Sequence, residues 1–128
     1  MREIEFRVWD KDAQQYYQPA FILGDDIWVA LDNNKPFELD CIGAIYGDIL
    51  VIEQYTGLKD KNGTKIYEGD RVKLDLNNEG YKNSVVVYRD NYMQFMFDHP
   101  KEVYTMTEHH FKPKDLQVIG NVHEEELK

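Results

Sequence analysis

The chain has 128 residues, of which 42% are hydrophobic and 30% charged, which suits one globular domain or two very small ones sharing a core. The formal net charge is −9 and is uneven: residues 1–53 hold 4 Lys and Arg against 11 Asp and Glu, whereas residues 54–128 hold 11 against 13. Because nucleic acids are bound through Lys and Arg, the first half is poorly suited to a phosphate backbone. The favoured interpretation of this negative charge is that it keeps the protein soluble. The more specific alternatives are an acidic surface for a basic partner and mimicry of nucleic acid.

The single cysteine, Cys41, excludes an intrachain disulfide and favours a reducing compartment. Its neighbours in sequence supply no cation, so we expect a buried and unreactive thiol. The first seven residues lack the apolar segment of a signal peptide, and no apolar run approaches the ~20 residues that span a bilayer. We therefore predict a cytoplasmic protein that does not contact a membrane.

In the first half of the chain, apolar residues tend to recur at every second position. Ile4, Phe6 and Val8 alternate with charged residues and Trp9, which predicts a strand with one buried face. The other signals are, in chain order, a turn at 10–12, strands at 21–23 and 27–31 around a turn at 24–26, a loop at 32–36, an ambiguous stretch at 37–46, and a buried strand at 49–52.

The second half is rich in turn signals. Asn62-Gly63 predicts a tight type I′ turn, and Val72, Leu74 and Leu76 share one face of a predicted strand at 71–76. The other signals are turns at 68–70, 77–80 and 89–91, strands at 84–88, 92–97, 103–107 and 117–122, a helical turn at 113–116, and a frayed tail at 124–128. Short strands at this spacing indicate a small barrel with little helix.

No metal site is predicted from the histidines, which are His99, His109, His110 and His123. The adjacent pair would point to opposite faces of a strand, so it cannot easily share one ion. The spacing that zinc sites require is also missing.

Asp60, Asn62 and Gly63 resemble part of a calcium loop, but the twelfth position, which needs Glu, holds Arg71. Carboxylate pairs such as Asp25-Asp26 are common in any acidic chain, and no nucleophile lies in a recognisable motif. We therefore predict no cofactor and no metal, and we expect that the protein is not an enzyme.

Aromatic and basic residues interleave in one part of the second half, where they would form a stacking platform for single-stranded nucleic acid. The favoured interpretation is that Phe95 and Phe97 belong to the core, since local Asp residues nearly balance the basic ones. The residues of this hypothetical platform are Lys82, Tyr88, Arg89, Tyr92, Phe95 and Phe97.

Three blocks of sequence together resemble the YopX-like family of phage and prophage proteins. The first, residues 1–10, ends in Arg7-Val8-Trp9-Asp10; the second runs from Gln54 through Gly63 and continues at 66–70; the third is residues 118–124. The resemblance implies an SH3-like β-barrel in the C-terminal part, an origin in a phage or prophage within a bacterial cell, and no established activity.

The family resemblance provides no catalytic residues, so the shared motif residues are interpreted as stabilising the fold, the glycines and aspartates through turns. They are Trp9, Asp10, Tyr55, Thr56, Gly57, Asp60, Asn62, Gly63, Tyr67, Gly69, Asp70, Gly120 and Asn121.

The sequence thus predicts an all-β protein. An N-terminal β region at 1–53 would pack on an SH3-like barrel at 66–123, joined by a strand and hairpin at 54–65 and followed by an acidic tail at 124–128. We expect a non-enzymatic binding module whose partner is a protein, either a host or phage protein or a second copy of the chain. The alternatives are single-stranded nucleic-acid binding through the barrel and, third, a metal-dependent hydrolase or nuclease.

Overall fold

The structure is a computed structural model that describes residues 4–32, 35–45, 47–76, 80–89, 94–98, 103–105 and 112–125. The chain divides into two compact units, Met1–Tyr55 and Thr56–Lys128. The strands of the first unit are β1 (Phe6–Asp10), β2 (Gln15–Leu23), β3 (Asp26–Asp32), β4 (Lys35–Ala44) and the first part of β5 (Leu50–Lys59). The second unit adds β6 (Lys65–Tyr67), β7 (Asp70–Asp75), β8 (Tyr81–Arg89), β9 (Gln94–Asp98), β10 (Val103–Thr105), the 3₁₀-helix η2 (Pro113–Asp115), β11 (Leu116–Asn121) and α1 (Val122–Glu125).

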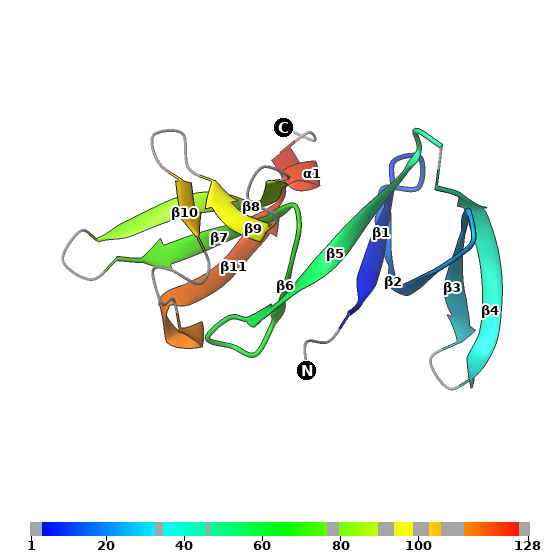
Figure 1. Ribbon diagram of the computed structural model, residues 1–128, viewed down its shortest axis with the longest axis horizontal. Helices are drawn as coiled ribbons and strands as arrows, with labels where there is room; N and C mark the ends of the chain where they lie inside the picture. Colours follow the sequence, from blue (N-terminus) through cyan, green and yellow to red (C-terminus); the bar gives the residue numbers. More distant parts are fainter. Residues whose placement is uncertain are drawn as a thin grey trace. The chain divides into compact units, whose positions relative to one another are not determined.

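The described elements confirm the all-β class. They form two antiparallel sheets, with strand orders β4-β3-β2-β1-β5-β6 and β10-β9-β8-β7-β11 (Figure 1). The pairing of the described strands closes neither sheet into a barrel. No helix among the described residues has the length and apolar character needed to cross a bilayer.

The core of the first unit lies on one face of its sheet. Val8, at the centre of β1, is fully buried and clusters with Ala20 of β2 and with Ile27 and Val29 of β3. β1 pairs with β2 on one side and with β5 on the other, which makes it a central strand. The predicted single buried face is correct for Val8 but wrong for the strand as a whole: Arg7 and Trp9 on the opposite face are also buried, and Ile4 is 69% exposed.

In the second unit, every second residue of β7 points into the core. In β7, Val72 and Leu74 are fully buried, whereas the intervening Arg71 and Lys73 are only half-buried. The cluster comprises Ile66, Val72, Leu74, Val86, Phe95, Phe97 and Leu116. β7 lies between β8 and β11, so residues from both neighbours complete this core.

Several local predictions differ from the structure. The loop predicted at 32–36 is too long, because β3 includes Asp32 and β4 already contains Lys35 and Pro36. Ile49 lies outside β5 and is 48% exposed, so the predicted buried strand begins one residue later. β2 begins at Gln15, ahead of its apolar residues.

The C-terminal prediction was also incomplete. Glu124 belongs to α1, not to a frayed tail. A short helix forms here because the preceding side chain caps its first turn, a local signal that the acidic composition of the tail conceals. Parts of the predicted turns at 77–80 and 89–91, and of the strand at 103–107, lie outside the described residues.

Candidate functional site

We call the three sequence blocks that resemble the family the signature blocks, their shared motif residues the signature residues, and residues 60–64 of the second block the signature hairpin. The turn in this hairpin differs from the predicted type I′ turn. The N–H of Gly63 donates to the carbonyl of Asp60 at 3.0 Å, and the N–H of Asp60 donates to the carbonyl of Thr64 at 2.9 Å. Only Gly63 has a positive φ, +80°, whereas a type I′ turn would require one at Asn62 as well. The loop is therefore a type I turn followed by a glycine bulge, and the type I′ assignment was wrong.

The side chain of Asp60 explains this choice of turn. Its Oδ1 accepts the N–H groups of Asn62 and Thr64, each at 2.9 Å, while its Oδ2 accepts the N–H of Val118 in β11 at 3.0 Å. Burial of this carboxyl, which is 3% exposed, opposes its ionisation. The hydrogen bonds from Val118, Thr64 and Asn62 outweigh that effect and hold the pKa of Asp60 below its ordinary value.

The hairpin also covers one edge of the second sheet. Lys61 donates its N–H to the carbonyl of Leu116 at 3.0 Å, next to the Asp60–Val118 hydrogen bond. β11 is the terminal strand of that sheet, so these contacts occupy backbone groups that an uncovered edge would offer to other chains.

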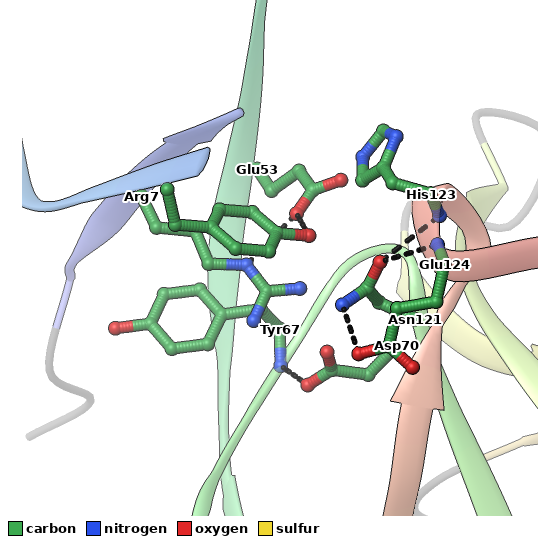
Figure 2. A network of polar contacts seen from close by, with 8 residues as sticks. Arg7, Glu53, Tyr67, Asp70, Asn121, His123 and Glu124 are labelled. Atoms are coloured by element: carbon green, nitrogen blue, oxygen red, sulfur yellow. Dashed lines mark hydrogen bonds and ion pairs between the residues drawn. The ribbon is translucent and has the colours of Figure 1, made fainter. Parts of the chain in front are cut away.

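Three further residues of the second block, Tyr67, Gly69 and Asp70, stabilise the turn before β7. The Tyr67 N–H donates to Oδ2 of Asp70 at 2.8 Å, the contact drawn as a dashed line in Figure 2. Gly69 has φ +84°, donates to the carbonyl of Val86 and accepts from the N–H of Val122, both at 2.9 Å. The turn is thereby attached to β8 and to the C-terminal block.

Two other signature residues make local side-chain contacts, Asn121 at the start of α1 and Thr56 between β5 and β6. Oδ1 of Asn121 accepts the N–H groups of His123 at 2.9 Å and Glu124 at 3.2 Å, so Asn121 is the N-cap of α1 (Figure 2). The hydroxyl of Thr56 donates to the carbonyl of Ile66 at 2.8 Å and accepts the N–H of Leu58 at 3.2 Å.

The first block contributes to a buried ionic cluster in the first unit. Arg7 and Glu53 face each other across β1 and β5, with Nε 2.8 Å from Oε1 (Figure 2). The Tyr16 hydroxyl donates to the same Oε1 at 3.0 Å, and the Arg7 guanidinium lies 4.3 Å from the centre of the Tyr16 ring. Trp9 packs edge-on against Tyr16, with 4.9 Å between ring centres.

The structure thus brings the second and third signature blocks together through Asp60 and Gly69. Asp10 lies in the first unit, where its Oδ1 accepts the N–H groups of Asp12 and Ala13 at 3.0 Å and fixes the β1–β2 turn. The interpretation of the signature residues as stabilising the fold stays a prediction, and these contacts are the physical argument for it.

The candidate functional site is a groove at one end of the first unit, with a volume of about 290 Å³. We call it the acidic groove. It is formed where β1 ends, β4 ends and β5 begins, and the N–H of Lys11 donates to the carbonyl of Ile49 at 3.0 Å beside it. Its lining residues are Asp10, Asp12, Ile42, Gly43, Ala44, Gly47, Asp48, Ile49 and Leu50.

The acidic groove combines three carboxyl groups with apolar walls. Asp12 and Asp48 are exposed, and Ile49 is 48% exposed, so both kinds of surface meet solvent. The sequence offered only a weak signal for it, because most of the lining comes from the stretch interpreted as ambiguous, 37–46, and the turn after it. Asp10 is the one predicted motif residue that lines the groove.

Other sequence hypotheses have clear outcomes. Phe95 and Phe97 lie in the core of the second unit, so they do not form a stacking platform with the half-exposed Tyr88.

Cys41 is exposed and not buried, which corrects the sequence interpretation. Burial was expected because free cysteines are usually buried and no cation adjoins Cys41 in sequence, and neither argument uses the position of Cys41 in β4.

The histidines give no centre for chemistry among the described residues. His123 is buried in α1, and the other three histidines lie outside the residues that the structure describes. Within the described ranges, no group of three or more His, Cys, Asp or Glu side chains is arranged to hold a metal ion.

Comparisons with known proteins agree with this architecture. The crystal structure of protein EF1440 from Enterococcus faecalis is similar, with a TM-score of 0.64 and 23% sequence identity over 98% of this chain and 97% of that one. At that identity the likeness concerns the fold alone. No curated protein matches the sequence. A family model described as YopX protein matches residues 5–127, nearly the whole chain, and the chain therefore belongs to the YopX protein family.

Proposed function

We propose that this protein is a non-enzymatic binding module that holds a basic segment of a partner protein in the acidic groove. The observation that carries the proposal is the meeting of Asp10, Asp12 and Asp48 with the apolar Ile49 and Leu50 around one open volume. A Lys or Arg side chain matches both features, since its aliphatic stem covers apolar surface while its charge reaches a carboxylate.

The size of the groove supports a side-chain ligand. Its volume of about 290 Å³ lies just below the range of pockets that bind whole small molecules, roughly 300–1,000 Å³. One or two side chains of a partner would fill it. The charge of the first unit adds to the argument, because 11 Asp and Glu against 4 Lys and Arg attract a basic partner before contact.

An array of short peptides tests this proposal directly. Peptides in which Lys or Arg is flanked by Leu or Ile are compared with acidic counterparts of the same length, using the whole purified chain as the probe. We expect binding of the basic–apolar peptides that weakens with added salt. Equal binding of the acidic peptides would contradict the proposal.

Matched variants localise the binding. Asp12→Asn/Asp48→Asn removes two groove carboxylates, whereas Asp26→Asn/Asp40→Asn removes two exposed carboxylates of the same unit outside the groove. Ile49→Ser removes an apolar wall, and Leu23→Ser, at a 54% exposed residue outside the groove, is its control. Only the groove variants should lose peptide binding; equal losses in variant and control would place the interaction elsewhere.

Finer features of the protein remain part of the proposal. The SH3-like barrel, the phage or prophage origin, the cytoplasmic location and self-association all stay predictions. Self-association is favoured by β4, the terminal strand of its sheet, and by the consecutive exposed side chains of Phe21, Ile22 and Leu23 on β2. Light scattering over a range of concentrations tests it.

A further inference from the structure

The second unit carries a small pocket of opposite character, which we call the lysine pocket. Lys61 from the signature hairpin, Lys73 from β7 and Lys114 from η2 line a volume of about 60 Å³ together with Tyr81 from β8. The other lining residues are Asp75, Asp115, Leu116 and Gln117. Three lysines from three separate segments thus line one depression.

The fold explains why these lysines converge. Lys73 lies on the face of β7 that points away from the core, out of phase with Val72 and Leu74, and it is paired with Gln117 of β11. The Lys61 N–H donates to the carbonyl of Leu116 at 3.0 Å, which holds the hairpin beside the start of β11. Since η2 immediately precedes that strand, Lys114 is brought to the same place.

The balance of charge in the pocket is positive. Two carboxylates, Asp75 and Asp115, share the lining with the three lysines, which leaves one excess positive charge. Asp115 is already engaged, because its Oδ2 accepts the N–H of Lys112 at 3.0 Å. In a chain of net charge −9, a local excess of cations marks a place where an anion can be held.

Tyr81 adds an aromatic surface next to these charges. Its side chain is 65% exposed, and Nζ of Lys73 lies 4.4 Å from the centre of its ring. The volume of about 60 Å³ is far below the roughly 300–1,000 Å³ of pockets that enclose whole small molecules, so it suits a small charged group and not a nucleobase. A base attached to such a group would have to lie outside, where the tyrosine ring is exposed.

We propose that the lysine pocket binds the phosphate of a nucleotide unit whose base stacks on Tyr81. The ligand is either a free mononucleotide or one unit of a single-stranded nucleic acid, which share this chemistry. The site differs from the platform that the sequence indicated around Phe95 and Phe97, and it does not depend on the acidic groove. Exposed aromatic rings beside cations are the usual means of holding single strands without reading their sequence.

The test measures binding of three probes to the full chain at about 50 mM and about 200 mM salt. The affinity that comes from phosphate contacts falls steeply between these two concentrations. The probes are inorganic phosphate, adenosine monophosphate and a fluorescent oligothymidylate of about ten nucleotides, a length within the usual range for such sites. We expect the oligothymidylate or the mononucleotide to bind better than phosphate, with affinity falling as salt rises. The tighter of the two identifies the source of the ligand.

Variants assign the binding to the pocket. Lys61→Gln/Lys73→Gln/Lys114→Gln should weaken binding at least about tenfold and reduce its salt dependence, while Lys59→Gln, at an exposed lysine outside the pocket, should not. Tyr81→Ala should cost about tenfold for nucleotide probes and leave inorganic phosphate unaffected, whereas Tyr81→Phe should bind normally.

Three results would overturn the proposal. These are no binding of any nucleotide probe at the lower salt concentration, binding that survives the triple lysine substitution, and an identical loss in Lys59→Gln. Because the substituted side chains are exposed or half-exposed, circular dichroism and thermal unfolding of each variant should match the unsubstituted chain.

Discussion

The carboxylate of Asp60 accepts a hydrogen bond from the backbone N–H of Val118 at 3.0 Å, across 58 positions of the chain. The same carboxylate organises its own turn through Asn62 and Thr64. One buried side chain therefore links the signature hairpin to the edge strand of the second sheet.

Removal of this carboxylate should destabilise the second unit. Asp60→Ala leaves the Val118 N–H and two turn N–H groups without their acceptor, and a buried donor without a partner costs about 1–3 kcal/mol. We expect a loss of at least about 2 kcal/mol in the free energy of unfolding, measured by urea denaturation. Asp115→Ala, which removes an exposed capping contact with Lys112, is the control and should cost less.

Asp60 should also make stability depend on acid. Its pKa in the folded chain lies below its ordinary value, so the ionised group stabilises the fold above about pH 4. This contribution is lost as the pH falls through the folded-state pKa. Asp60→Asn should therefore show a smaller loss of stability than the unsubstituted chain between about pH 5 and about pH 2. Parallel curves for the two proteins would contradict this assignment.

Gly63 should resist substitution for reasons of backbone conformation alone. Its φ is +80°, and a Cβ added there would meet nothing within 4 Å. We expect Gly63→Ala to cost about 1–2 kcal/mol and Gly63→Asn less, because Asn tolerates the left-handed region better. Gly47→Ala is the control: Gly47 has no positive φ, and its new Cβ would lie at an ordinary 3.7 Å from the Ala44 carbonyl.

The Thr56 hydroxyl should contribute a measurable part of stability. Thr56→Val keeps the shape of the buried side chain but deprives the Ile66 carbonyl and the Leu58 N–H of their partner. A loss of about 1–2 kcal/mol is expected in chemical denaturation. Thr56→Ser keeps the hydroxyl and should lose less; if it loses as much, the effect comes from packing and not from the hydrogen bonds.

Arg7 and Glu53 should be strongly coupled in the first unit. They are 8% and 4% exposed, so removing either partner leaves a buried charge without its counterion, at a cost of about 3 kcal/mol. The double variant Arg7→Met/Glu53→Met should cost clearly less than the two single substitutions together. Tyr16→Phe, which removes only a hydroxyl, should cost about 1 kcal/mol. Additive single effects would exclude the coupling.

Cys41 should react in the native protein, since it is exposed. We expect one thiol per chain to react with Ellman's reagent without denaturant, and none in Cys41→Ala. Reaction only after unfolding would show that the thiol is buried, as expected from the sequence.

Local sequence was sufficient to specify the features that depend on neighbouring residues. Alternation around Val72 indicates which face of the strand is buried, because successive side chains point to opposite faces. Gly63 and Gly69 mark turns because their φ values suit few other residues. The signature blocks likewise identified the family from the order of their residues.

The contacts between distant segments depend instead on the three-dimensional fold. No local pattern pairs Asp60 with Val118, gathers Lys61, Lys73 and Lys114 around Tyr81, or joins Asp12 and Asp48 to the apolar wall of the groove. The same holds for the exposure of Cys41, because the type of a residue does not fix which side of a strand meets solvent. Such contacts depend on strand order and register, which are fixed by the summed packing of residues far apart in the chain.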